Sequence, residues 1–251
     1  MNTTPTQRIG MIVPSLNTIG EDDFRRFCPP DVAYHVHRIR LRKEGGVVTP
    51  ESLLRAYLEA MEEATYLKDM GPSVITFNCT GASVAHGPQG DGELAERMTR
   101  ELGVASSNTM VAIKRALERV GARKIVHVCP FADKFSSGEK ASLEGAGLQV
   151  LKSVGLNFVD AREAARMDPA ALAEVALGHA QAGMDALLLS CANVRAFEAV
   201  AHLEDKLGVP VITSNQAVLW DCLELAGWQG QVSGGGRLLQ QCGQGAPVRA
   251  A

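Results

Sequence analysis

The sequence has 251 residues and a mass of 26.7 kDa; 46% of the residues are apolar, 21% are charged, and the formal net charge is −3. This composition is typical of a globular protein large enough to bury a sizeable core, and it excludes a chain that is disordered throughout. The near-neutral charge, the lack of a Lys or Arg run and an aromatic content of only 5% argue against nucleic acid or an anionic membrane as a partner.

Apolar runs and amphipathic segments alternate along the chain. In the first half of the chain they predict a strand at 9–13, a helix at 49–64, a strand at 74–77, and helices at 91–102 and 108–120. In the second half they predict strands at 125–128 and around 150–151, a helix at 168–183, a strand at 187–189, a helix at 194–207, a strand at 209–213 and a helix at 215–226. Continuously apolar strands between amphipathic helices are typical of parallel sheets that helices cover on both faces.

The location of the protein is predicted from what its sequence lacks. Its longest apolar runs, such as 186–189, are far too short to span a bilayer. Residues 1–8 are polar and do not have the apolar segment of a signal peptide. We therefore expect a cytoplasmic protein whose six cysteines are reduced.

Two of these cysteines occupy matching positions. Cys79 and Cys191 each follow a predicted buried strand and precede a predicted helix, which is where open parallel sheets place ligand-binding groups. Amides at a helix N-terminus lower the pKa of a thiol and bind carboxylates. A buried cysteine is also a common small core residue, but the matched context of the pair favours catalysis. Two similar lobes that face each other would bring both thiols to one cleft.

The loop after the first strand is rich in neutral hydrogen-bond donors. Its sequence, Val13-Pro14-Ser15-Leu16-Asn17-Thr18, offers two hydroxyls and one amide, and such groups suit a carboxylate. A plain polar turn is the alternative interpretation. The chain has no CxxC pair and no third ligand near His35 and His37, so the sequence predicts no metal site.

Five short motifs together resemble the aspartate/glutamate racemase superfamily, and within it the branch of maleate cis-trans isomerases and arylmalonate decarboxylases. The resemblance covers about residues 8–228. The motifs are Val-Pro-Ser-x-Asn-Thr (13–18), Cys-Thr-Gly-Ala-Ser (79–83), Pro-Phe-Ala-Asp (130–133), Ser-Cys-Ala-Asn (190–193) and Ile-Thr-Ser-Asn-Gln-Ala (212–217).

This resemblance implies an α/β fold of two pseudo-symmetric lobes, each a parallel sheet flanked by helices, with the active site between them and no cofactor. We assign residues 1–107 and 214–251 to the lobe that carries Cys79, and residues 108–213 to the lobe that carries Cys191. As in the isomerases, Cys79 is expected to add to an alkene as a thiolate while Cys191 handles a proton. The partners expected are a small dicarboxylate such as maleate and further copies of the chain, in a dimer or tetramer.

The resemblance also implies a set of substrate-binding residues and two departures from the family. The family often has Tyr where this chain has Phe131, which cannot donate a hydrogen bond. Isomerases carry an Asn near the position of Asn157. The expected substrate-binding residues are Pro14, Ser15, Asn17, Thr18, Thr80, Gly81, Phe131, Ala192 and Asn193.

Three functions follow as alternatives. The first is a cofactor-independent cis-trans isomerase of a small dicarboxylate. The second is a racemase that uses both thiols or a decarboxylase of malonate type; decarboxylases of this branch usually have glycine at the first cysteine position, so Cys79 argues against that reaction. The third is a two-lobed binding protein without turnover. Outside the motifs, His86 is expected in solvent, His127 in the core and Cys222 on a buried helix face.

Overall fold

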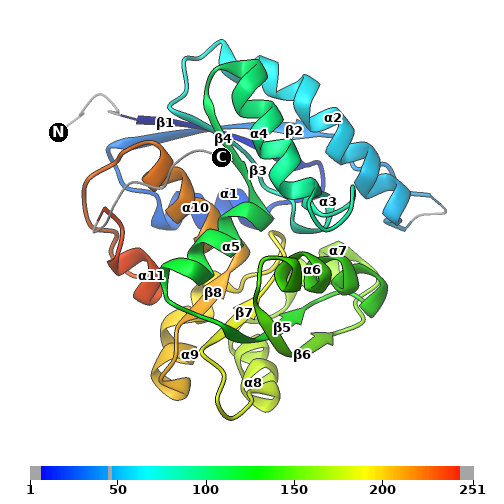
Figure 1. Cartoon of the computed structure of the whole chain (residues 1–251), viewed down its shortest axis with the longest axis vertical. Helices are drawn as coiled ribbons and strands as arrows, with labels where there is room; N and C mark the ends of the chain where they lie inside the picture. Colours follow the sequence, from blue (N-terminus) through cyan, green and yellow to red (C-terminus); the bar gives the residue numbers. More distant parts are fainter. Residues whose placement is uncertain (1–6, 45–46, 244–251) are drawn as a thin grey trace.

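The computed structural model describes residues 7–44 and 47–243, without the side chains of 133–135. Its strands form two four-stranded sheets in which every pair of neighbours is parallel (Figure 1). The first sheet has the order β2-β1-β3-β4, with β1 at Gln7–Pro14, β2 at Val32–Ile39, β3 at Val74–Phe77 and β4 at Ala105–Asn108. The second has the order β6-β5-β7-β8, with β5 at Lys124–Cys129, β6 at Gln149–Gly155, β7 at Ala186–Leu189 and β8 at Val211–Thr213. The predicted fold class is confirmed.

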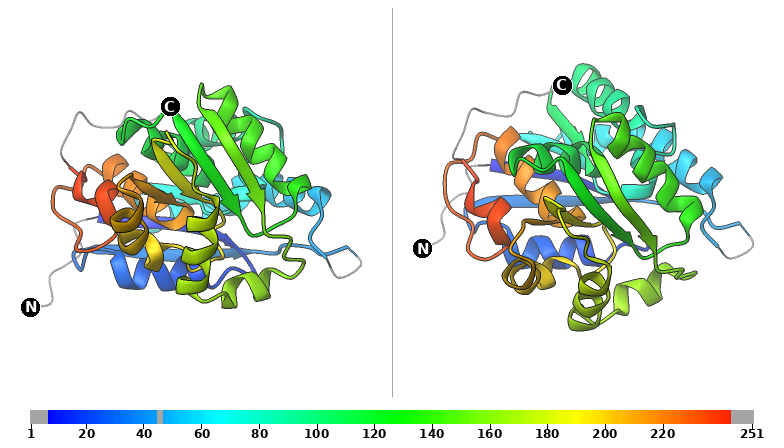
Figure 2. Two further views of the ribbon diagram at one scale, coloured as in Figure 1. Left: turned by 90° about the horizontal axis from the view of Figure 1, so that it is seen from below. Right: turned by 60° about the horizontal axis from the view of Figure 1, so that its bottom comes forward.

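Helices cover both sheets and fill the space between them. They are α1 (Ile19–Phe27), α2 (Pro50–Lys68), α3 (Thr80–Ser83), α4 (Gly90–Leu102), α5 (Thr109–Arg119), α6 (Asp133–Gly145), α7 (Ala161–Arg166), α8 (Pro169–His179), the 3-10 helix η1 (Phe197–Ala199), α9 (Val200–Leu207), α10 (Ser214–Leu225) and α11 (Gly236–Gln240). Helix α2 packs on β1, β2 and β3, while α5 and α10 pack on each other and contact strands of both sheets. Figure 2 shows the two sheets from two further directions.

Strand β1 shows why both faces of the first sheet are buried. Ile9, Met11 and Val13 join the core that continues into the second sheet, whereas Ile12 packs with Phe77 in a core under α2. Side chains alternate across a strand, so a strand that is apolar at every position needs cover on both faces. The apolar run at 9–13 is therefore explained by the burial of both faces of the first sheet, as expected from the sequence.

Helix starts follow their capping residues, with one correction. Thr49 and Asn108 cap α2 and α5 as predicted, each accepting hydrogen bonds from the backbone of the first turn. The prediction that Asn215 caps the last long helix is wrong. Thr213 is the N-cap, in a capping box with Gln216, and the buried Asn215 side chain makes contacts to other segments instead.

The predicted helix at 194–207 is also too long. Residues 190–196 form a turn, η1 follows, and α9 begins only at Val200. The Asn193 side chain accepts hydrogen bonds from the backbone amides of Thr18 and Ile19. These bonds hold the segment as a loop against the start of α1. The loop thereby carries Cys191 without a helix directly after it.

Two further expectations concern the chain as a whole. Strands β1–β4 lie within 7–108 and β5–β8 within 124–213. The boundaries of the two lobes stay a prediction. Residues 1–6, 45–46 and 244–251, which we assign to the first lobe, lie outside the described residues. The same holds for most of the polar N-terminal segment at 1–8. In the described ranges, none of the helices has the length and apolar character needed to cross a membrane.

Candidate active site

A cavity of about 260 Å³ lies where loops from both sheets meet. The loops that form it follow β1, β2, β3, β5, β6 and β7, so the cavity is at the carboxyl ends of parallel strands. Its lining residues are Pro14, Leu16, Asn17, Leu41, Val47, Val48, Leu53, Asn78, Cys79, Thr80, Gly81, Phe131, Ala132, Glu139, Asn157, Phe158, Val159, Ala161, Cys191, Ala192 and Asn193. Both predicted catalytic cysteines are among them.

Hydrogen bonds tie the loops of the two thiols to each other. Cys79 is the N-cap residue of α3, and its carbonyl accepts hydrogen bonds from the amide and the hydroxyl of Ser83. Cys191 follows β7 and has a backbone φ of 128°, which residues other than glycine rarely adopt. The Cys191 amide donates to Ser214 Oγ at 2.9 Å, and that hydroxyl lies 3.0 Å from the hydroxyl of Thr80. Ser214 thus links the two cysteine loops.

Backbone amides lower the pKa values of these thiols as expected, but the net shift is upward. Burial raises the pKa of Cys79 to about 12 and raises the pKa of Cys191 still further above its ordinary value. The amides of Ala82 and Asn193 act in the opposite direction but do not outweigh burial. Helix α3 has only four residues, and no helix directly follows Cys191. Burial therefore favours the neutral form of both thiols.

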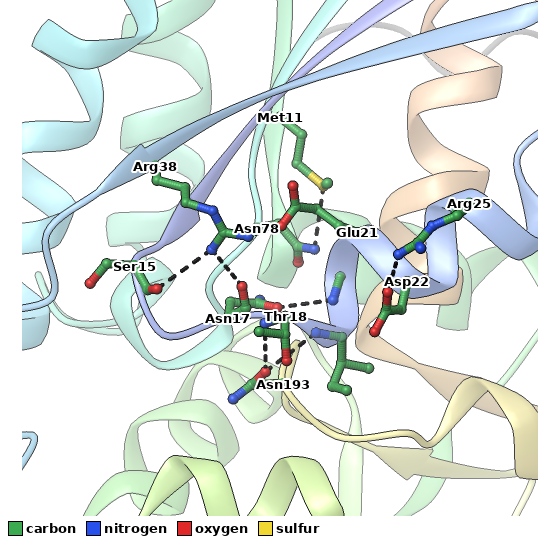
Figure 3. A network of polar contacts seen from close by, with 12 residues as sticks. Met11, Ser15, Asn17, Thr18, Glu21, Asp22, Arg25, Arg38, Asn78 and Asn193 are labelled. Carbon is green, nitrogen blue, oxygen red and sulfur yellow. Dashed lines mark hydrogen bonds and ion pairs between the residues drawn. The ribbon is translucent and has the colours of Figure 1, made fainter.

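Seven of the nine predicted substrate-binding residues line the cavity: Pro14, Asn17, Thr80, Gly81, Phe131, Ala192 and Asn193. Ser15 and Thr18 are not among the lining residues, which corrects their predicted placement. The Ser15 hydroxyl accepts from the Leu41 amide, and the Thr18 amide donates to Asn193 Oδ1 at 3.0 Å (Figure 3). These two residues shape the loop instead of facing the cavity.

Two of the asparagines that line the cavity, Asn17 and Asn193, differ in which side-chain groups are free. Asn17 Oδ1 accepts from the Gly20 amide at 2.9 Å, while its Nδ2 has no hydrogen-bond partner within the described part of the chain. Both ends of the Asn193 side chain are engaged, because Oδ1 accepts from Thr18 and Nδ2 donates to the carbonyl of Ala161. Asn17 can therefore donate to a ligand, and Asn193 holds the loops together. Figure 3 shows the contacts of Asn17 and the contact of Asn193 with Thr18.

Sequence reasoning missed Glu139, which is the only Asp, Glu, Lys, Arg or His among the described lining residues. It lies on α6, a helix that the patterns did not predict, and no motif distinguishes it. Asn157, for which the sequence left open whether it reaches the site, does line the cavity. Many of the remaining lining side chains are apolar, including Leu41, Leu53 and Phe158.

Three other expectations concern residues outside the lining. His127 is fully buried and hydrogen-bonded in β5, and Cys222 is buried on α10, as predicted. His86 has 53% of its side chain exposed, as expected, and stacks on Tyr57. Within the described residues, no group of three or more His, Cys, Asp or Glu is arranged to hold a metal ion.

Comparison with known proteins places this chain in a family. The sequence profile of the arylmalonate decarboxylase family matches residues 9–239. Arylmalonate decarboxylase from Bordetella bronchiseptica is 28% identical over 246 residues, covering 96% of this chain and 100% of its own length. Maleate isomerase from Geobacillus stearothermophilus is 27% identical over 244 residues, covering 92% and 96%. A solved mutant of the Nocardia farcinica maleate cis-trans isomerase with a covalently bound succinylcysteine intermediate is 22% identical, with a TM-score of 0.85 over 94% of this chain and 98% of its own.

Proposed function

Because the chain belongs to the arylmalonate decarboxylase family, we propose that it is a cis-trans isomerase of a small unsaturated dicarboxylate, with maleate as the simplest substrate, and that it needs no cofactor. The observation that carries this proposal is the pair of thiols, Cys79 and Cys191, on one cavity. A protein that only binds an acid has no need of a thiol at the end of a strand in each sheet.

The proposed reaction uses the two thiols in different roles. The Cys79 thiolate adds to one alkene carbon, forming a C–S bond while the π electrons move to the neighbouring carbon. Cys191 gives its proton to that carbon, and the former double bond is now free to rotate. Cys191 then takes a proton back, the C–S bond breaks, and its electrons return to sulfur. The trans diacid leaves, and both cysteines regain their starting forms.

Two features support a reaction of this kind. The Nocardia farcinica enzyme carries a succinylcysteine intermediate, which is the adduct that a cysteine would form with maleate. In this chain Asn17 Nδ2 has no other described partner, and Thr80 lies directly beside Cys79, so both can donate to a substrate carboxylate.

A two-cysteine racemase is the second candidate. The described part of the cavity wall has no Lys, Arg or His and is largely apolar, which favours an acid with one carboxylate and an apolar substituent over a dianion. In that reaction one thiolate removes the α-proton and the opposite thiol returns a proton to the other face.

Proton NMR in deuterated buffer separates the candidates. The isomerase converts maleate into fumarate. The racemase leaves maleate unchanged but introduces deuterium at the α-carbon of a chiral arylpropionate, and a decarboxylase releases carbon dioxide from an arylmalonate. Absence of all three reactions, in a folded sample whose cavity still binds these acids, would leave only a binding protein.

A further inference from the structure

A buried carboxylate stands between the two cysteine loops. Glu139 is 5% exposed and lines the cavity together with Cys79 and Cys191. Its helix, α6, packs on β6 and on α3, the helix that begins directly after Cys79. Its negative charge is one cause of the raised pKa of both thiols, so the carboxylate interacts electrostatically with both.

Polar side chains from three strands or strand ends hold this carboxylate. Glu139 Oε2 accepts a hydrogen bond of 2.5 Å from the hydroxyl of Ser190, the residue before Cys191. His127 Nε2 lies 3.1 Å from the same oxygen and 2.7 Å from the Ser190 hydroxyl, and His127 Nδ1 lies 3.0 Å from Ser153 Oγ. His127 is fully buried and Ser190 is 3% exposed. These contacts fix the carboxylate firmly, since each of them is made inside the protein.

The second carboxylate oxygen of Glu139 takes no part in these contacts. Within the described residues Glu139 Oε1 has no hydrogen-bond partner, although the side chain borders the cavity. Because the Glu139 side chain lines the cavity and this oxygen has no described protein donor, its partner is expected in the cavity: a thiol or a ligand.

The charge balance of the cavity indicates what this oxygen does. Each buried thiol must lose a proton before it can react, because the thiolate is the reactive form. Loss of that proton to solvent would place a second negative charge beside Glu139 in a region of low dielectric constant. Transfer of the proton to Glu139 leaves the number of charges unchanged and only moves the negative charge from oxygen to sulfur.

We propose that Glu139 is the proton acceptor for Cys191, and that Ser190 and His127 are the positioning residues that direct its carboxylate. In this step the S–H bond of Cys191 breaks, its electron pair stays on sulfur, and an O–H bond forms at Oε1. The proton returns along the same path at the end of the cycle. A Cys79 thiolate follows when Cys79 passes its own proton to the Cys191 thiolate. The inference rests on the part of the proposed function that makes Cys191 a reacting thiol, and it holds for the isomerase and the racemase alike.

The test is the alkylation rate of Cys191 by iodoacetamide, followed peptide by peptide with mass spectrometry in the folded protein at neutral pH. Glu139→Gln keeps the size of the side chain and the acceptor for Ser190 but cannot take up a proton. We expect the rate at Cys191 to fall at least about tenfold, since loss of a general base commonly costs that much or more. Glu144→Gln, the same change on an exposed part of α6, should leave the rate unchanged.

The opposite sign would overturn the inference. If Glu139 were only a negative charge that disfavours the thiolate, Glu139→Gln would raise the alkylation rate, and an unchanged rate would show that it has no effect on the thiol. Should Glu139→Gln fail to fold, the double variant Glu139→Leu with His127→Leu removes the acceptor together with its buried partner, a change that cores often tolerate. The same fall is expected there. No substrate is used, so a wrong substrate proposal cannot produce either result.

Discussion

At the scale of single residues, the proposed reaction uses two thiols that burial keeps neutral. Cys79 and Cys191 line one cavity, and burial keeps the pKa of each well above the ordinary value of a cysteine. A neutral thiol does not react with solutes that enter the cavity by chance. The proposed reaction therefore needs a proton acceptor close to the thiols, the role that we propose for Glu139.

Replacement of either thiol by a hydroxyl tests the catalytic roles. We expect Cys79→Ser and Cys191→Ser each to lower kcat by at least about 10³-fold, because serine is a far weaker nucleophile and acid. Stability should change little, since the side chains are nearly isosteric. Cys28→Ser, the same change at a half-buried cysteine outside the cavity, is the control and should retain full turnover. If one cavity variant kept more than about a tenth of the wild-type kcat, that cysteine would be structural.

Phe131 tests the substrate. It lines the cavity at a position where the family often has a tyrosine hydroxyl. If the substrate is a dicarboxylate, Phe131→Tyr should raise kcat/KM on maleate about 2- to 13-fold, which corresponds to the net value of one added hydrogen bond, about 0.5–1.5 kcal/mol. We expect this increase on maleate and not on an aryl-substituted malonate, with wild type and variant assayed side by side.

A decrease on maleate, citraconate and the arylmalonate together would count against maleate. It would show that the phenylalanine packs against an apolar group of the substrate, since burying an unpaired hydroxyl costs about 1–3 kcal/mol.

At the scale of elements, the loop between β1 and α1 combines a structural and a binding role. Asn17 Oδ1 accepts a hydrogen bond from the Gly20 amide in the first turn of α1, and Nδ2 is available to the cavity. The sequence left two interpretations of this loop open: a plain polar turn, or a set of donors that bind a carboxylate. In the structure the two ends of one side chain can serve both.

Two substitutions at this position separate the roles. Asn17→Ala removes the acceptor and the donor, so we expect a loss of stability of about 1 kcal/mol, as for other helix-start residues, and a higher KM. Asn17→Asp keeps the acceptor for Gly20 but places a carboxylate where the donor was. It should retain the stability of the wild type in urea unfolding while KM rises at least about 10-fold, the value of a hydrogen bond to a charged group. Wild-type kinetics in both variants would show that the loop is only a turn.

At the scale of the whole molecule, one buried asparagine joins segments far apart in sequence. Asn215 on α10 accepts from Asn78 beside Cys79 and donates to the carbonyl of Ala192 beside Cys191. It also donates to Asp23 on α1 at 2.7 Å. Burial raises the pKa of Asp23 to about 7, although the hydrogen bond from Asn215 acts in the opposite direction. Asn215 therefore contributes both to the geometry of the site and to the stability of the fold.

The raised pKa of Asp23 predicts a loss of stability as the pH rises. Between its unfolded pKa near 3.8 and its folded pKa of about 7, the unfolded chain releases the proton while the folded chain retains it. The contribution of this group is thus fully present below the unfolded pKa and is lost as the pH rises through the folded pKa. In urea unfolding we expect the free energy of unfolding to fall by about 2–3 kcal/mol more in the wild type than in Asp23→Asn between about pH 5 and pH 8. Parallel pH profiles for the two proteins would contradict the assignment of Asp23.

The sequence alone determined the parts of this protein that local chemistry decides. Apolar runs such as 74–77 have only one stable arrangement, a strand covered on both faces, and caps such as Thr49 and Asn108 fix helix starts through bonds within one turn. The motifs around Cys79 and Cys191 placed both thiols at strand ends, where parallel sheets gather ligand-binding groups. The fold class and the pair of cysteines could therefore be predicted.

Only the tertiary structure decided what depends on segments distant in sequence. The short turn after Cys191 exists because Asn193 bonds to the loop at Thr18 and Ile19, and Asn215 is free for its bridging contacts because Thr213 caps the helix. The pKa of each thiol depends on how deeply the packing of two sheets buries it, which reverses the direction expected from helix amides alone. Glu139 became visible only when α6 brought it beside Ser190 and His127, since a glutamate on a helix has no local signal that distinguishes a cavity from solvent.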